Sequence, residues 1–114
     1  WGPFSHAVKA GDFVFVTGQM PTMPDDPSRP VEGGIEAQTH RVMENLKLVL
    51  HSARLDFDRV VFASVYLVNF QDFGKMNVVY ETYFRADALP SRTCIGVTGL
   101  AVGALVEIDF IVAA

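Results

Sequence analysis

The segment 60–68, VVFASVYLV, is a nine-residue run of β-branched and aromatic character. This composition predicts a β-strand. Side chains alternate between the two faces of a strand, so both faces of this strand are apolar. One face carries Val60, Phe62, Tyr66 and Val68, and the other carries Val61, Ala63, Val65 and Leu67. Such a strand belongs in the middle of a sheet that is covered on both sides.

Weaker patterns predict the elements around this strand. Turn residues at 9–12 separate two short strands, about 5–9 and 13–17, and residues 20–34, with four of the six prolines, form an exposed loop. Apolar spacing predicts an amphipathic helix over 35–54.

In the second half of the chain, Asp72 is a candidate N-cap for a helix that continues to Phe84. Two further strands follow, at about 92–98 and 104–112. The order strand, strand, helix, strand, helix, strand, strand predicts one domain over residues 1–114, an α+β or α/β sandwich with a single sheet.

Two helices can cover only one face of this sheet, so the second apolar face needs another cover. The simplest cover is a second copy of the chain, which predicts a homo-oligomer with closed symmetry whose sheets face one another. The alternative is that the loop 20–34 folds over this face.

The segment 90–109, PSRTCIGVTGLAVGALVEID, contains an arginine, the single cysteine and two carboxylates. Glu107 and Asp109 are two residues apart on the strand predicted at 104–112, so they point to the same face. The alternate apolar residues of that strand point to the core. A short domain that places two acids on one strand face either leaves that face exposed to solvent or uses it for a function.

If 92–98 pairs antiparallel with 104–112, Arg92 and Cys94 join the two acids on the face assigned to the subunit interface. An arginine can hold a substrate carboxylate by two parallel hydrogen bonds, and a glutamate can orient or deprotonate a water. The same two residues can also form a plain interface salt bridge. Cys94 is interpreted as a small buried apolar side chain without chemistry of its own.

Composition narrows the classes of partner. The net charge is −4 and the nine basic residues form no cluster, which argues against nucleic acid as a partner. A single cysteine makes no internal disulfide and favours a reducing, cytoplasmic compartment. The chain has no uninterrupted apolar run of about 20 residues and no visible signal peptide, so no membrane partner is expected. The three histidines lack metal-ligand spacing.

Several motifs occur in order along most of the chain. They are Gly2-Pro3-Phe4-Ser5, Val16-Thr17-Gly18-Gln19, Ile35-Glu36-Ala37-Gln38-Thr39, Glu44-Asn45-Leu46-Lys47, Asp72-Phe73, Asn77-Val78-Val79-Tyr80, Pro90-Ser91-Arg92 and Leu105-Val106-Glu107-Ile108. In these motifs the chain resembles the RidA (YjgF) family of enamine/imine deaminases, also known as L-PSP endoribonucleases.

The resemblance implies a chorismate-mutase-like (YjgF-type) α+β fold, a mixed sheet with two helices on one face. It also implies a homotrimer in which the sheets form an inner barrel, with a site at each subunit interface. The implied reaction is hydrolysis of 2-imino or enamino acids, of the 2-aminoacrylate and 2-iminobutanoate type, to 2-keto acids and ammonia. No metal or organic cofactor is implied, because an iminium carbon is already electrophilic.

The resemblance also assigns residues. Arg92 would hold the substrate carboxylate, the backbone carbonyl of Cys94 would accept a hydrogen bond from the substrate nitrogen, and Glu107 would hold the attacking water. The remaining positions near the pocket are Phe4, Thr17, Gly18 and Asn77.

Phe4 departs from the family pattern, in which many imine deaminases have a tyrosine. The change removes one hydrogen bond, worth about 1 kcal/mol, and makes the pocket more apolar. A larger catabolic enamine such as 2-aminomuconate is therefore an alternative substrate. Two further alternatives are an L-PSP-type endoribonuclease and a non-catalytic ligand-binding trimer, which would have no use for Glu107 as an acid.

Overall fold

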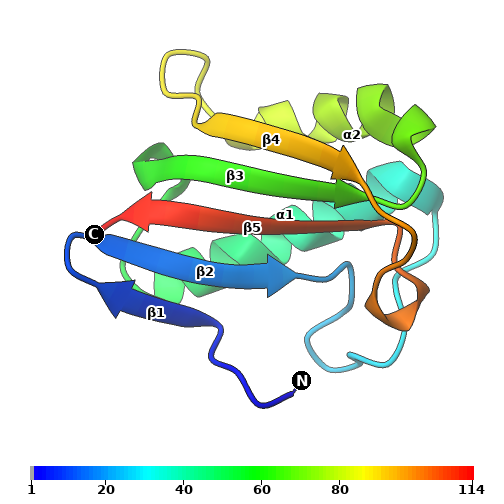
Figure 1. Cartoon of the computed structure of the whole chain (residues 1–114), viewed down its shortest axis with the longest axis horizontal. Coiled ribbons are helices and arrows are strands. Elements are labelled where there is room, and N and C mark those ends of the chain that lie inside the picture. The colour runs from blue at the N-terminus through cyan, green and yellow to red at the C-terminus, as the bar shows by residue number, and fades with distance from the viewer. Residues whose placement is uncertain (1) are drawn as a thin grey trace.

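The computed structural model describes residues 2–114, which form a five-stranded mixed sheet with two α-helices on one of its faces (Figure 1). The strands are β1 (Ala7–Ala10), β2 (Phe13–Gln19), β3 (Val60–Leu67), β4 (Ser91–Gly96) and β5 (Val106–Ala113), and the helices are α1 (Gly34–Ser52) and α2 (Phe73–Tyr80). The order across the sheet is β1-β2-β5-β3-β4. The predicted α+β class and the predicted order of elements are confirmed.

One predicted strand pairing is wrong. β4 does not pair with β5; it runs parallel to β3 at the edge of the sheet, with Arg92 beside Ala63 and Cys94 beside Val65. β5 lies between β2 and β3 and is antiparallel to both. On the helix-covered side of β5, Val106, Ile108, Phe110 and Val112 are almost completely buried, which favours a central position, whereas most of β4 is exposed and suits an edge.

The predicted faces of β3 are also wrong at its first residues. The register between β3 and β5 shifts between Val60 and Phe62, as in a β-bulge. As a result Val60 is buried with Ala63, whereas Val61 is 43% exposed. The bulge places Val60 on the helix-covered face, together with Val65 and Leu67, and leaves Phe62 and Tyr66 on the opposite face.

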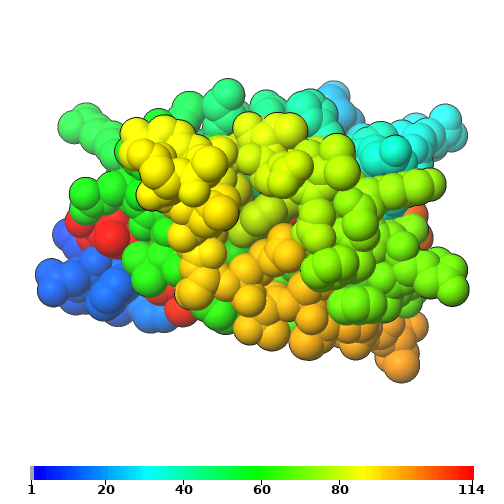
Figure 2. Space-filling model, turned by 90° about the horizontal axis from the view of Figure 1, so that it is seen from above, coloured from blue at the N-terminus to red at the C-terminus, as the bar shows by residue number. Residues whose placement is uncertain are grey.

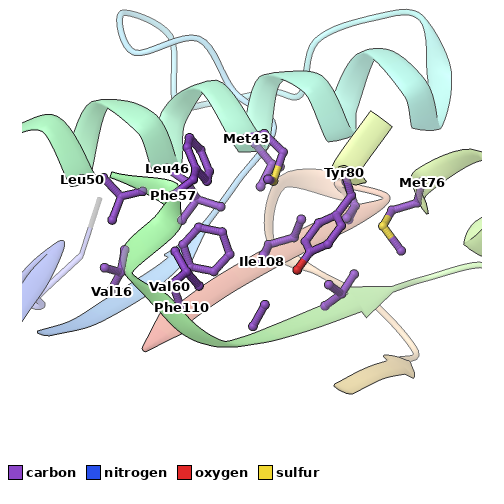
Figure 3. Packing of buried hydrophobic residues seen from close by; sticks show 14 of the residues in the cluster. Val16, Met43, Leu46, Leu50, Phe57, Val60, Met76, Tyr80, Ile108 and Phe110 are labelled. Carbon is purple, nitrogen blue, oxygen red and sulfur yellow. The ribbon is translucent and has the colours of Figure 1, made fainter. Parts of the chain in front are cut away.

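The core lies between the helices and the sheet (Figure 3). α1 begins at Gly34. Gly34 and the preceding Gly33 both have positive φ, a conformation that glycine adopts without strain. Residues at helical spacing then pack against the sheet, namely Val42, Met43, Leu46 and Leu50, each exposed by 1% or less. The second predicted helix is shorter than expected, since α2 ends at Tyr80 and a 3₁₀ turn follows at Glu81–Tyr83. Asp72 occupies its N-cap position but makes no side-chain capping hydrogen bond.

The proline-rich loop packs on the helix side of the sheet. The side-chain amide of Asn45 in α1 donates to the carbonyl oxygens of Met20 (2.9 Å) and Thr22 (2.8 Å). The loop therefore does not cover the second face, and that alternative is wrong. On this open face several large apolar side chains are 43–53% exposed, namely Val8, Phe13, Phe15 and Ile95.

Candidate functional site

Arg92 lies on the helix-covered side of β4, where it contacts α2. Its Nη1 donates to Oδ1 of Asn77 at 2.7 Å. The guanidinium carbon is 4.8 Å from the ring centre of Tyr80 and 5.5 Å from that of Phe73. A hollow of about 320 Å³ opens beside it, lined by Asn77, Tyr80, Glu81, Leu89, Pro90 and Arg92. Figure 2 looks onto this edge of the molecule, where β4 (orange) lies beside α2 (yellow-green).

Cys94 is the next residue of β4 on the same face, half-buried and packed against the core. Burial raises the pKa of its thiol, and the positive charge of Arg92 only partly opposes this shift. A thiol with a raised pKa stays protonated at neutral pH and is a poor nucleophile. The sulfur thus fits the predicted role of a small apolar side chain. Because β4 is an edge strand, backbone groups on its outer side have no partner strand within residues 2–114.

Glu107 lies on the opposite, open face of the sheet, beside Tyr66 of β3. It is half-buried, and desolvation raises the pKa of its carboxyl group, with a further contribution from the charge of Asp109. A raised pKa makes the carboxylate a better general base near neutral pH. The backbone of Gly18 packs directly against this carboxyl group, so that even a β-carbon at residue 18 would collide with it.

Asp109 has a partner within its own chain. Its Oδ2 accepts a hydrogen bond of 3.0 Å from the hydroxyl of Tyr66, the strand neighbour of Glu107. Burial, together with this hydrogen bond, raises the pKa of Tyr66 and keeps the phenol protonated. The two acids of the predicted strand face therefore differ: Asp109 is engaged by a hydroxyl, whereas Glu107 lies against a glycine.

The N-terminal segment lies close to Gly18. The amide of Thr17 donates to the carbonyl of His6 (2.8 Å), and its hydroxyl donates to the carbonyl of Ser5 (2.5 Å). These bonds hold Phe4, which is 54% exposed, next to a hollow of about 410 Å³. The hollow is mostly apolar and is lined by Phe4, His6, Gly18, Gln19, Met20, Thr22, Met23, Pro24, Pro27, Asn45, Leu48 and Val49.

The predicted site residues thus form two groups. Arg92, Cys94 and Asn77 lie on the helix-covered side of β4, whereas Glu107 lies on the open face of β5, with Gly18 packed against it. β3 separates the two strands, so the predicted crevice that combines Arg92 with Glu107 on one face does not exist within a single chain.

Sequence reasoning missed the aromatic contacts of Arg92. Phe73 and Tyr80 lie on the helix predicted between Asp72 and Phe84, but the sequence predicts no contact between them and Arg92. The available signal was their helical spacing with Asn77, which places all three along one side of α2.

Among residues 2–114, no group of three or more histidine, cysteine or acidic side chains is arranged to hold a metal ion. His51 is exposed; His40 is exposed too, but its Nδ1 lies 2.7 Å from the hydroxyl of Tyr83, which donates to Glu44 at 2.7 Å. In the same part of the chain, neither α-helix combines the length and hydropathy needed to cross a membrane.

Comparisons with known proteins agree with this architecture. A family model described as endoribonuclease L-PSP matches residues 1–114. A RutC family protein of Pyrococcus abyssi is 42% identical over 110 residues, which cover 96% of this chain and 85% of that protein. The crystal structure of RidA from the Antarctic bacterium Psychrobacter sp. has a TM-score of 0.91 at 32% identity, covering 99% of this chain and 89% of that chain. That of Escherichia coli TdcF with bound serine has a TM-score of 0.90 at 26% identity, covering 100% of this chain and 90% of that chain. The chain therefore belongs to the RidA/YjgF/L-PSP family, which includes the RutC proteins.

Proposed function

We propose that this protein is a hydrolytic deaminase that converts 2-imino or enamino acids, of the 2-aminoacrylate and 2-iminobutanoate type, to 2-keto acids and ammonia. The observation that carries the proposal is the pair of unlike groups described above. A guanidinium is fixed beside a hollow on one side of the sheet, and a half-buried carboxyl with a raised pKa lies on the other. The bound serine in TdcF, a relative, supports an amino-acid-like ligand.

The two groups lie on opposite faces of the sheet, so a site that uses both needs two chains. We place it between subunits of a homotrimer, with Arg92 and Cys94 from one chain and Glu107, Gly18, Thr17 and Phe4 from the next. The exposed apolar side chains of the open face supply the surface that such an assembly buries. The edge position of β4 leaves it accessible to a neighbouring chain.

In the proposed reaction Arg92 binds the substrate carboxylate, and the carbonyl of Cys94 accepts a hydrogen bond from the substrate nitrogen. Glu107 takes a proton from a water molecule while the water oxygen bonds to the imine carbon, giving a carbinolamine. Glu107 then returns the proton to nitrogen. As the carbon–nitrogen bond breaks, its electron pair leaves with ammonia, and the hydroxyl gives its proton back to the Glu107 carboxylate and becomes the keto group. One water is consumed and one ammonia is released for each substrate, without a cofactor.

The single half-buried Cys94 is compatible with the reducing cytoplasm that we propose as the compartment.

The test is release of ammonia and keto acid from 2-imino acids generated enzymatically in the assay. We expect Arg92→Ala to lose turnover, and Glu107→Gln to lower kcat by about 10²–10⁴-fold, as for loss of a general acid–base group. Arg85→Ala and Glu36→Gln are matched controls, since both residues are exposed and outside the candidate site. Turnover of 2-aminomuconate alone would favour the alternative substrate class. Binding of a keto acid without turnover would favour a non-catalytic trimer.

Mixed trimers test the placement of the site between chains. Arg92→Ala and Glu107→Gln chains should each be nearly inactive as homotrimers, but a mixed trimer contains some interfaces with both intact residues. Random mixing in equal amounts should restore about a quarter of wild-type turnover, because each interface takes one residue from each of two chains. No recovery would place both residues of each site in the same chain and refute the arrangement.

The family description also names an endoribonuclease, and the same protein can be incubated with single-stranded RNA. RNA binding draws on clustered positive charge, whereas this chain has a net charge of −4. We therefore expect no cleavage by the wild type. Cleavage that disappears in Arg92→Ala would replace the deaminase proposal.

A further inference from the structure

One side of α2 holds the guanidinium of Arg92 by three contacts. Phe73, Asn77 and Tyr80 are three or four residues apart, so they project from the same side of the helix. The guanidinium carbon lies over both rings, 5.5 Å from the ring centre of Phe73 and 4.8 Å from that of Tyr80, within the range of a cation–π contact. Asn77 accepts a hydrogen bond from Nη1 at 2.7 Å.

Both rings are themselves held in place. Phe73 stacks on Phe70 with ring centres 5.2 Å apart and planes inclined by 18°. Tyr80 is 5% exposed and packs against Phe84, with ring centres 4.9 Å apart. Figure 3 shows its ring extending from α2 toward the sheet near Ile108. Supported rings restrict the rotamers of an arginine side chain that would otherwise be mobile.

Within residues 2–114, the hydroxyl of Tyr80 has no hydrogen-bond partner although it is buried. It donates no hydrogen bond to Asn77 or to any other group of the hollow. The contribution of Tyr80 to Arg92 therefore comes from the face of its ring. Phenylalanine at this position would retain that face, whereas leucine would remove it.

We infer that Phe73 and Tyr80 are positioning residues that hold the guanidinium of Arg92 flat, while Asn77 fixes its rotation, so that its remaining N–H groups are presented to a carboxylate ligand. This inference rests on the proposed function, in which Arg92 binds the carboxylate of the substrate. It adds residues that act through the arginine and do not touch the reacting atoms. It also gives Asn77 a role toward Arg92 in addition to its expected place beside the ligand.

The first experiment measures binding of 2-oxobutanoate, a 2-keto acid product, by isothermal titration calorimetry. Phe73→Leu and Tyr80→Leu should each weaken binding by about 5- to 30-fold, the size expected for loss of a partly desolvated cation–π contact. Tyr80→Phe should recover most of the affinity lost in Tyr80→Leu. Val78→Ala is the matched control, because Val78 is on α2 but 62% exposed and outside the hollow.

The second experiment needs no ligand. In the NMR spectrum of the wild type, rotation about the Nε–Cζ bond of Arg92 should be slow and the motion of its Nε–H group restricted. In Phe73→Leu, the rotation should be faster and the Nε–H group more mobile. Phe73 is only half-buried, so this variant remains informative if Tyr80→Leu fails to fold.

Unchanged affinity for 2-oxobutanoate in Phe73→Leu, or equal losses in Tyr80→Phe and Tyr80→Leu, would overturn the inference. A mobile Arg92 guanidinium in the wild type would overturn it as well. If the wild type does not bind 2-oxobutanoate while Arg92 is rigid and released by Phe73→Leu, the proposed function fails and the positioning of Arg92 stands.

Discussion

Substitution of Gly18 by alanine should displace the carboxyl group of Glu107 while leaving the fold intact. A β-carbon at residue 18 would lie 2.9 Å from Cδ and 3.1 Å from Cγ of Glu107, and closer still to Oε2. Ordinary contacts between carbon atoms are about 3.5–4.0 Å, so the carboxyl group must move by roughly 1 Å. The side chain is flexible enough to move, and the backbone can stay, because the φ of Gly18 is not positive.

A shift of about 1 Å in a catalytic group can lower a rate by as much as 10²-fold. We therefore expect kcat/KM for 2-iminobutanoate to fall by about 10²-fold in Gly18→Ala, with a change in the free energy of unfolding of no more than about 1 kcal/mol. The assay is ammonia release, with urea unfolding of the same samples. Gly74→Ala is the matched control, since a β-carbon there meets nothing within 4 Å.

A double-mutant cycle tests whether the activity loss in Gly18→Ala comes from the displaced carboxyl group of Glu107. In a Glu107→Gln background the reactive carboxylate is already absent, so adding Gly18→Ala should cost little further activity. The reasoning is refuted if Gly18→Ala retains wild-type kcat/KM. It is also refuted if the same 10²-fold loss appears in the Glu107→Gln background, since the alanine would then act elsewhere.

Three further predictions concern stability and assembly. Burial raises the pKa of Glu107, so the folded state binds its proton more tightly than the unfolded chain and the ionised form destabilises the fold. Glu107→Gln should raise Tm at pH 7–8, with a gain that shrinks as the pH falls through the raised pKa of Glu107 and is lost below 4.5, the ordinary value; an equal gain at every pH would contradict this. Tyr83→Phe removes the hydroxyl that contacts Glu44 and His40, which should cost about 1 kcal/mol in urea unfolding. It should also let the pKa of Glu44, which this hydrogen bond lowers, rise in an NMR titration; an unchanged Glu44 would count against the bond. Phe15→Glu on the open face should reduce the mass seen by light scattering to that of one 12.5 kDa chain, whereas an exposed-helix control, Val78→Glu, should not.

The sequence alone was sufficient for most of the local structure. The periodicity of residues 35–54 predicted α1, and the alternation after residue 104 predicted that Glu107 and Asp109 share a face. These features depend on neighbours within a few positions along the chain. The apolar character of both sides of β3 likewise predicted an uncovered sheet face, and the structure confirms that face for the single chain.

The pairing of β4 could not be read from the sequence, because strand order is set by contacts between distant segments. Adjacency in the chain favoured pairing with β5, but the buried side chains of β5 take a central position and β4 becomes the edge beside β3. That choice turns Arg92 toward α2 and leaves Glu107 on the other face. The sequence therefore predicts Arg92 and Glu107 as the two residues of the candidate site. Only the tertiary structure showed that a single chain keeps them apart, since the face that a side chain takes in a sheet depends on which strand lies next to it.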